Sequence, residues 1–363
     1  MSLCHLLVIS GGRSPEHEVA LQSALNVVAA VDRKAFDLAV VGIDKDGAWR
    51  QLPSDDFVRH RDDPTRIALA PGGRPVTLCC REGRGWMVPL DGSPAWPVDV
   101  AFPVLHGAYG EDGTIQGFLA LMGVPCVGCD TASSANSMDK AITKRLLQAA
   151  GIPVAPGVVV TRGASWPTAE ALGREFGWPL FVKPARLGSS VGVVKVKTPA
   201  ELAPALTEAF RYDDKVLVEQ CLRGREIECA VLGNDAPRAS LPGEVVPRHE
   251  FYSYAAKYLD DQGAALYAPA DLPAETTQRV QAMAVAAFQA MGCSGLARVD
   301  FFLMPDGSLA VNELNTIPGF TRISMYPRLW QCSGLTYTEL VGELVRLAME
   351  SHRQRASLCT SFT

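Results

Sequence analysis

The first hundred residues alternate between apolar runs and amphipathic stretches, as in an α/β protein. Residues 4–10 (CHLLVIS) are mostly apolar and end at Gly11-Gly12, which predicts a strand followed by a tight turn. Ser14-Pro15 suits the N-cap and first position of a helix, and EHEVALQSALNVVAAV continues with apolar residues at helical spacing. Residues 36–43 (FDLAVVGI) predict a second strand, so the chain begins as a β-α-β unit.

The following segment interrupts this order. Residues 44–95 are dense in Gly, Pro and Arg and predict an irregular insertion with short strands. Residues 98–105 (VDVAFPVL) predict a buried strand, and the loop HGAYGEDG after it lies where α/β folds place ligands. We further expect a helix over 113–122, a short strand at VPCVG and a helix that follows SMDK and stops at Gly151.

From Gly157 the pattern changes to short strands joined by loops. The predicted strands are GVVV, WPLFVKP, VVKV, KVLVEQ and REIECAVLG, with a helix over 199–212 between the third and fourth. A glycine-rich loop, RLGSSVGV over residues 186–193, follows Lys183. Backbone N–H groups and hydroxyls of such a loop can face phosphate oxygens, with Lys183 supplying a fixed charge. A loop of this composition can also simply turn the chain.

The most informative stretch lies near the C-terminus. ARVDFFL and LAVNELN flank Pro305-Asp306-Gly307, and an Asp-Gly step between apolar runs predicts a hairpin with a two-residue turn. In that register Asp300 pairs with Glu313 and Arg298 with Asn315, and all four side chains share one face of the sheet. Two carboxylates and a carboxamide oxygen suit Mg²⁺ or Mn²⁺. The alternative is a solvated strand face on which Arg298 neutralises the acids.

The residues around this hairpin complete the pattern. Residues 247–269 are rich in aromatic side chains and lack periodicity, which is typical of a lid over an active site. A helix over 274–291 precedes the hairpin, a helix over 336–349 follows it, and we expect a frayed polar tail from about Ser351.

Composition narrows the classes of function. A chain of 363 residues suits two or three domains, and its net charge of -5 offers no basic excess for nucleic acid or an anionic membrane. No uncharged apolar run approaches the ~20 residues that span a bilayer, and the short N-terminal apolar run predicts a strand and not a signal peptide. The ten cysteines are then expected as reduced thiols of a cytoplasmic protein. Cys126 and Cys129 form a lone C-x-x-C without the other ligands of a zinc site.

Nine segments together resemble the D-alanine–D-alanine ligases of the ATP-grasp superfamily. They occur in family order between residues 9 and 327: GGRSPEHEVAL, FPVLHGAYGEDGTIQG, SMDK, FVKPARLGSSVGV, VLVEQ, GREIECAVLG, YSYAAKY, ARVDFFL and NELNTIPGFTRISMYP. The longer subgroup of these ligases is the most similar, and Ala20 and Leu187 are small departures from the family pattern.

The resemblance implies a mixed α/β (α+β) ATP-grasp fold of three domains. Residues 1–130 would form an N-terminal Rossmann-like (pre-ATP-grasp) domain, residues 131–217 a central subdomain with the phosphate loop, and residues 218–363 a C-terminal subdomain with the metal hairpin and the lid. The implied activity is ATP-dependent ligation of two D-alanine molecules through a D-alanyl phosphate, releasing ADP and phosphate, for peptidoglycan synthesis by a cytoplasmic homodimer. Another ATP-grasp carboxylate–amine ligase and a catalytically inactive nucleotide-binding regulator are the alternatives.

The resemblance also assigns residues. Asp300, Glu313 and Asn315 would hold two Mg²⁺ or Mn²⁺ ions, with Glu313 bridging. The residues around ATP would be Lys140 and Lys183 at the phosphates, Ser189 and Ser190 in the loop, Glu219 and Leu222 near the base, Glu226 near the ribose, and Lys257 on the lid. The residues around D-alanine would be Glu16 at the first ammonium, His106 beside it, Arg298 and the Gly319 N–H at the tetrahedral centre, and Ser324 and Met325 at the second carboxylate. Ser189 and Tyr258 would form a hydrogen-bonded group with Glu16.

Several of these residues also have a purely structural explanation. Glu16 could only favour a helix N-terminus, His106 could be a hydrogen-bonded loop histidine, and Lys140 could be an exposed lysine of a first helical turn. Tyr252, Tyr254 and Tyr258 could pack a loop.

Overall fold

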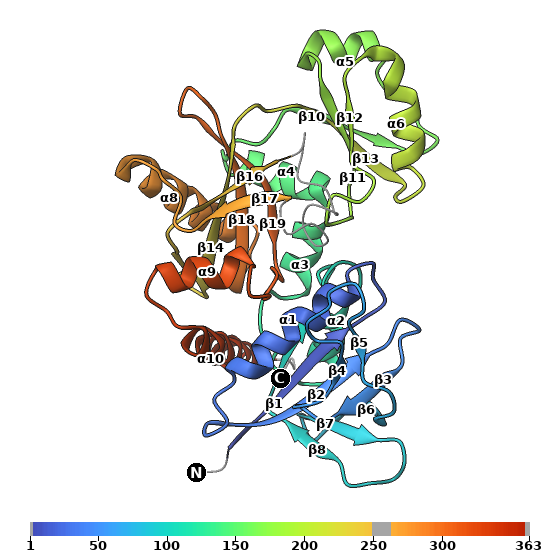
Figure 1. The fold of residues 1–363 in the computed structure, drawn as a ribbon, viewed down its shortest axis with the longest axis vertical. Coiled ribbons are helices and arrows are strands. Elements are labelled where there is room, and N and C mark those ends of the chain that lie inside the picture. The colour runs from blue at the N-terminus through green and yellow to red at the C-terminus, as the bar shows by residue number, and fades with distance from the viewer. Residues whose placement is uncertain (1–2, 249–262, 360–363) are drawn as a thin grey trace.

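Three large β-sheets follow one another along the long axis of the molecule (Figure 1). The structure is a computed structural model, and it describes residues 3–248 and 263–359. Lys257, Tyr258, Tyr252 and Tyr254 lie outside the described residues. Among the described helices, none is both long enough and apolar enough to cross a membrane.

The sheet nearest the N-terminus has seven strands. In spatial order they are β8 (Trp96–Val98), β7 (Arg84–Pro89), β6 (Arg74–Arg81), β3 (Trp49–Leu52), β2 (Phe36–Ile43), β1 (Cys4–Gly11) and β9 (Val100–Val104). Strand β1, next to the edge strand β9, is parallel to both of its neighbours, and α1 (His17–Ala30) connects it to β2, so the predicted β-α-β start is confirmed. α2 (Thr114–Leu121) follows the loop after β9, and β4 (Val58–Arg59) pairs with β5 (Ala68–Leu69) in a small ribbon.

Three expectations for this region were wrong in detail. The insertion is more regular than its composition suggests, because β6 and β7 form a hairpin that extends the sheet. α1 begins at His17 and not at Pro15, because the Ser14 hydroxyl accepts from the Glu16 N–H at 3.1 Å and donates to the His106 carbonyl at 2.7 Å, which holds a turn before the helix. VPCVG is not a strand, since it makes a single bridge from Cys126 to Ala101.

The second sheet has four antiparallel strands. In order they are β10 (Gly157–Thr161), β13 (Lys215–Gln220), β11 (Leu180–Pro184) and β12 (Val194–Val196). α5 (Ala169–Phe176) and α6 (Leu202–Ala209) share a core with its strands. The predicted helix over 199–212 is shorter, because Pro199–Glu201 form a 3-10 turn and α6 ends at Ala209. α5 had not been predicted.

The third sheet carries the hairpin that was predicted to bind metal. Its strands are β17 (Ala264–Tyr267), β16 (Gly243–Pro247), β14 (Arg225–Gly233), β18 (Gly295–Leu303) and β19 (Leu309–Asn315), with β15 (Arg238–Ala239) beside β14. The helices of this part are α3 (Thr131–Met138), α4 (Lys140–Ala149), α8 (Ala274–Ala290), α9 (Met325–Cys332) and α10 (Tyr337–Ala356). The predicted lid boundaries were too wide, because Pro247 and residues 264–267 pair as strands. The tail prediction was also wrong, because α10 continues past Ser351 and has Arg353 and Arg355 in its last turn, where cations are favourable.

The hairpin of β18 and β19 has the predicted pairing but not the predicted turn. The Met304 N–H donates to the Ser308 carbonyl at 2.8 Å, so the loop has three residues and ends with Gly307 at a φ of +82°. Near this loop Phe301 therefore pairs with Val311, and the register then shifts so that Asp300 pairs with Glu313 and Arg298 with Asn315. The unpaired residue is Asn312, a β-bulge that compensates for the extra loop residue.

The first and last parts of the chain share one hydrophobic core. Buried residues of β1 and β9, including Leu6 and Phe102, belong to the same cluster as Tyr326 of α9 and Leu344 of α10. α10 contacts α1 and β9 directly, and it lies against this part of the molecule in Figure 1. This packing fixes α1 relative to the loop that precedes α9.

Candidate active site

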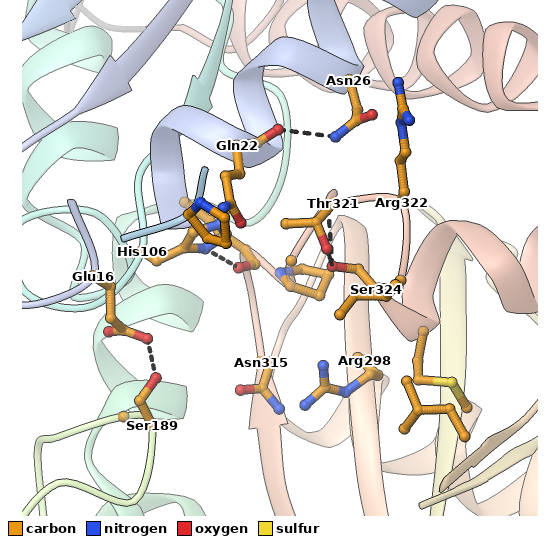
Figure 2. A pocket seen from close by; sticks show the side chains of 18 of the residues that line it. Glu16, Gln22, Asn26, His106, Ser189, Arg298, Asn315, Thr321, Arg322 and Ser324 are labelled. Carbon is orange, nitrogen blue, oxygen red and sulfur yellow. Dashed lines mark hydrogen bonds between the residues drawn. The ribbon is translucent and has the colours of Figure 1, made fainter. Parts of the chain in front are cut away.

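The residues predicted for substrate binding line a single cavity of about 580 Å³. Those within the described residues all contribute to it: Glu16, His106, Ser189, Arg298, Gly319, Ser324 and Met325. Figure 2 shows Glu16 and Ser189 at one side of the cavity and Ser324 at the other, with Arg298 and Asn315 between them.

The residues predicted for nucleotide binding line a second, narrower cavity. Every one of them that the structure describes lines it, together with the predicted metal ligands Asp300 and Glu313: Lys140, Lys183, Ser189, Ser190, Glu219, Leu222 and Glu226. Ser189, Arg298 and Glu313 border both cavities, which are therefore adjacent. A nucleotide bound in one cavity would therefore lie next to a substrate bound in the other.

Glu16 joins α1 to the glycine-rich loop. It is 7% exposed and occupies the N-cap of α1, yet its side chain makes no capping hydrogen bond. The Ser189 hydroxyl instead donates to Glu16 Oε1, as Figure 2 shows. Ser189 and Ser190 both have positive φ, of 53° and 59°, a strained conformation for residues other than glycine. A role confined to the helix terminus therefore does not account for where the Glu16 carboxylate points.

Gly107 makes room for this carboxylate. Its φ is +72°, and a Cβ added there would collide with Glu16 Oε2. The loop that follows β9 can approach Glu16 because this residue has no side chain.

His106 is buried, and hydrogen bonds occupy both of its ring nitrogens. Nδ1 lies 3.0 Å from the Ile317 carbonyl and Nε2 lies 2.9 Å from the Ser23 hydroxyl. Because a carbonyl only accepts, Nδ1 carries the proton. Burial alone would lower the pKa of His106, but Glu111 and Glu16 outweigh that effect and raise it. His106 lines the cavity, and these contacts make it a link between α1, its own loop and the segment before α9.

Glu219 is enclosed by two lysines. Lys144 Nζ and Lys183 Nζ each lie 2.8 Å from one of its carboxylate oxygens, and Glu219 is only 2% exposed. Burial would raise the pKa of Glu219, but the two ammonium groups lower it overall. Burial would likewise lower the pKa of Lys183, and Glu219 raises it. Sequence reasoning missed Lys144, although it lies four residues after Lys140 and thus on the same face of α4.

Lys140 is not an exposed first-turn lysine. It is the first residue of α4, its side chain is 15% exposed, and its Nζ lies 2.7 Å from the Leu187 carbonyl and 3.4 Å from Glu313 Oε2. Lys183 Nζ donates to Asn312 Oδ1 at 3.3 Å, so the bulge residue of β19 also faces this cavity. Two ammonium groups thus converge on the glycine-rich loop and the hairpin of β18 and β19, where phosphates are predicted to lie.

The acidic face of the hairpin is arranged around Arg298. Its Nε and Nη2 donate to the two carboxylate oxygens of Asp300, each at 2.7 Å, and Asn315 Nδ2 donates to Asp300 at 2.9 Å. Arg298 Nε also lies 3.1 Å from Oε2 of Glu228. Burial would lower the pKa of Arg298, but the negative charges of Asp300 and Glu228 outweigh this effect and raise it. Sequence reasoning missed Glu228, although alternation along REIECAV places it on the same face as Glu226.

The donor set of this face fits a hard divalent cation. Asp300 and Glu313 face each other across two strands, and the Asn315 amide nitrogen is engaged with Asp300, so its carboxamide oxygen is the atom available for a metal. Across residues 3–248 and 263–359, no group of three or more His, Cys, Asp or Glu side chains could hold a metal ion. Any metal bound here therefore depends on Asn315, on water or on a ligand oxygen in addition to the two acids.

The segment after β19 forms the far wall of the cavity. Ser324 is the N-cap of α9, yet its hydroxyl makes no capping bond and instead accepts from the Thr321 N–H at 2.9 Å. A Cβ at Gly319 would crowd the Ser324 hydroxyl in its present position, so glycine leaves room for that hydroxyl to face Thr321. The N-terminus of α9, which begins at Met325, is consequently available to a carboxylate.

The C-x-x-C pair is not part of this site. Burial raises the pKa of the Cys126 thiol to about 12, and Cys129 is buried with its sulfur 3.4 Å from the Leu296 carbonyl. Both are free thiols.

Two family models match the chain. The model described as D-ala D-ala ligase N-terminus matches residues 5–129, and the one described as D-ala D-ala ligase C-terminus matches residues 146–346. Among curated relatives, D-alanine--D-alanine ligase A of Chromobacterium violaceum is 51% identical over 98% of this chain and 97% of its own length. D-alanine--D-alanine ligase A of Salmonella typhimurium is 48% identical over 98% of both chains.

Solved structures agree with these matches. A D-alanine-D-alanine ligase from Coxiella burnetii superposes with a TM-score of 0.87 at 39% identity, covering 98% of this chain and 97% of that one. The VanG D-Ala:D-Ser ligase from Enterococcus faecalis gives a TM-score of 0.82 at 37% identity, covering 96% of this chain and 100% of that one. The predicted mixed α/β fold of the ATP-grasp type is confirmed, whereas the division into three domains stays a prediction.

Proposed function

The chain belongs to the D-alanine–D-alanine ligase family, and from this premise we propose which of its residues carry the reaction. The protein is an enzyme that joins two molecules of D-alanine, with ATP as co-substrate. The observation that carries the assignment of residues is the pair of adjacent cavities, one lined by the candidate substrate residues and one by the candidate nucleotide residues.

A carboxylate is a poor electrophile, so the first D-alanine must be activated. We assign its ammonium to Glu16, whose position is fixed by Ser189 and Gly107. Its carboxylate then faces Arg298 and the γ-phosphate of ATP, and attack on that phosphate gives an acyl phosphate and ADP. Arg298 offsets the repulsion between these two anions. The amine of the second D-alanine then attacks the acyl carbonyl to give a tetrahedral oxyanion, which Arg298 and the Gly319 N–H stabilise, and loss of a proton and of inorganic phosphate leaves the dipeptide.

The second D-alanine must lie on the opposite side of the same carbonyl. Its carboxylate is assigned to Ser324 and to the N-terminus of α9 at Met325, which directs its amine toward the cavity centre. Lys257 and Tyr258 lie outside the described residues; we assign Lys257 to ATP and Tyr258 to a hydrogen-bonded group with Glu16 and Ser189. An acyl phosphate is hydrolysed by water, so the reaction requires that solvent be kept from the site.

ATP is assigned to the narrower cavity. Lys140 and Lys183 neutralise its phosphates, Ser189 and Ser190 present the glycine-rich loop to them, Glu219 and Leu222 lie near the base, and Glu226 lies near the ribose. Asp300, Glu313 and Asn315 would hold two Mg²⁺ or Mn²⁺ ions. Such ions, when bound, neutralise phosphate charge and polarise the transferred phosphoryl group.

The test is an ADP-release assay with Mg²⁺ in which D-alanine is compared with L-alanine, D-serine and D-lactate. We expect D-alanine alone to support full turnover and the product to be D-alanyl-D-alanine. The Glu16→Gln variant should bind ATP normally and show a KM for D-alanine raised at least tenfold, because a buried ion pair is lost. ATP binding without turnover on any of these substrates would refute the assignment.

We also propose that the protein acts in the cytoplasm as a homodimer that supplies the dipeptide for peptidoglycan. The family premise supports this proposal. Light scattering coupled to size exclusion should give twice the mass of the 38.9 kDa chain, and a monomer at working concentration would contradict it.

A further inference from the structure

Glu228 is a carboxylate that the proposed reaction does not use, although it faces the candidate metal site. It lies on β14 directly opposite Asp300 of β18, and Asp300 lies opposite Glu313 of β19. Three acidic side chains therefore form a row across three neighbouring strands on one face of the sheet. Glu228 is 7% exposed and borders both cavities.

The Arg298 guanidinium lies within reach of two members of this row. Its Nε is 2.7 Å from Asp300 Oδ1 and 3.1 Å from Glu228 Oε2, and its Nη2 is 2.7 Å from Asp300 Oδ2. Arg298 thus uses both oxygens of Asp300 and shares one of its nitrogens with Glu228. Its side chain is only 17% exposed, so solvent screens these charges weakly.

A cation bound to Asp300 would change the balance of charge around Arg298. A divalent ion on Asp300 would place two positive centres on one carboxylate, and they would repel each other across a few ångströms in a buried site. Without a second acid the guanidinium either remains on Asp300 and opposes the metal, or leaves the position from which it faces the reacting carbonyl.

We propose that Glu228 is a positioning residue that holds the Arg298 guanidinium in place, and balances its charge, while Asp300 binds the divalent ion. This inference rests on the proposed function, because it takes Asp300 as a metal ligand and Arg298 as the group at the oxyanion. The geometric basis of this role is the distance of 3.1 Å between Arg298 Nε and Glu228 Oε2. The acidic side chain at position 228 thereby lets metal and guanidinium act together on one substrate.

The decisive variants distinguish positioning of Arg298 by direct contact from a general effect of negative charge. Glu228→Gln removes the charge at nearly constant shape, whereas Glu228→Asp keeps the charge and withdraws it from Arg298 Nε. Glu244→Gln is the matched control. Glu244 also pairs with an arginine of the same sheet, Arg225, at 2.7 Å, but it lies opposite Ile227 and so on the other face.

The measurement is Mn²⁺ binding to the full-length protein with ADP, followed by the electron paramagnetic resonance signal of free Mn²⁺. We expect affinity to fall about tenfold in Glu228→Gln and about threefold in Glu228→Asp, and to be unchanged in Glu244→Gln. At saturating Mg²⁺ both Glu228 variants should lower kcat with an unchanged KM for ATP, since Arg298 no longer faces the oxyanion correctly. Circular dichroism verifies that each variant is folded.

The outcomes are distinguishable. Wild-type affinity and kcat in Glu228→Asp, with a loss only in Glu228→Gln, would show a general charge effect and overturn the positioning role. An unchanged Glu228→Gln would overturn it as well, and so would an equal loss in Glu244→Gln. Failure of the wild-type protein to bind Mn²⁺ would instead refute the proposed metal site itself.

Discussion

Replacing Glu219 by glutamine should destabilise the protein strongly, because it leaves two buried lysines without their shared counter-charge. Lys144 and Lys183 each contact this carboxylate at 2.8 Å, and their side chains are 12% and 15% exposed. The Glu219→Gln substitution keeps the shape of the side chain and removes its charge. The remaining ammonium groups then repel each other across a neutral carboxamide.

The size of the effect follows from opposing contributions. With an effective dielectric constant of about 20, Coulomb's law gives roughly 6 kcal/mol of attraction for each contact at 2.8 Å. Desolvation of the three charges offsets several kcal/mol for each ion, so the pair energies do not appear in full as stability. Breaking a buried ion network by removing one partner costs about 3–5 kcal/mol in the free energy of unfolding, and we expect Glu219→Gln to fall in this range.

Urea denaturation followed by tryptophan fluorescence is the appropriate assay, because Trp178 packs against the core of the four-stranded sheet that carries Glu219. The matched control is Glu208→Gln on α6, which removes an exposed carboxylate 2.9 Å from Arg211 and should leave the urea midpoint where it is in the wild type. A Glu219→Gln variant within about 1 kcal/mol of the wild type would refute this account of the buried network.

The same network predicts a dependence on pH. The pKa of Glu219 in the folded protein lies below its ordinary value of 4.5, so its contribution to stability is present above pH 4.5 and is lost as the pH falls through the folded-state pKa. The stability difference between wild type and Glu219→Gln should therefore be complete at pH 7 and shrink below pH 4.5. A difference that does not shrink in acid would mean that the ion pairs are not its source.

Three further predictions test the loop, the bulge and the thiols. Ser189→Ala removes a hydrogen bond to the charged Glu16, so initial-rate kinetics should show about a tenfold higher KM for the first D-alanine with the KM for ATP within twofold, and equal changes in both would contradict it. Deleting Asn312 moves Glu313 out of register with Asp300, so Mn²⁺ binding should vanish while circular dichroism keeps its native form, and retained binding would show that the bulge does not set the site. Ellman's reagent should label the exposed thiols of the native protein rapidly, namely Cys80, Cys332 and Cys359. It should reach the buried thiols of Cys129, Cys229 and Cys293 only after denaturation, and rapid labelling of these three would contradict the packing.

The face-to-face placement of Asp300 and Glu313 could be predicted from the sequence, but the local geometry that produces it could not. A two-residue turn and a bulge-free strand predict the same pairs as a three-residue loop followed by a bulge at Asn312, because the two differences cancel. Alternation along a strand reports which residues share a face, and it does not report where one residue loops out.

Lys144 and Glu228 could be recognised only after the sheets came together. Lys144 meets Glu219 from a helix about seventy residues earlier in the chain, and Glu228 meets Arg298 across two strands separated by about the same distance. A single lysine or glutamate is common on the surface of any helix or strand, so neither residue stands out in the sequence. Partners brought together by tertiary packing leave no local pattern, whereas the lysine and glycine-rich loop that are adjacent in sequence do.

The core shared by β1, β9, α9 and α10 has a consequence for synthesis of the protein. The N-terminal sheet leaves the ribosome long before Tyr337, so the apolar face that α1 covers in part stays incompletely covered until the last helix is made. A premature stop codon just before α10 would leave the whole set of candidate catalytic residues translated, yet the product would expose Leu6, Phe102 and their neighbours to aggregation and proteolysis. The twenty residues of α10 therefore protect the newly synthesised chain from aggregation and proteolysis.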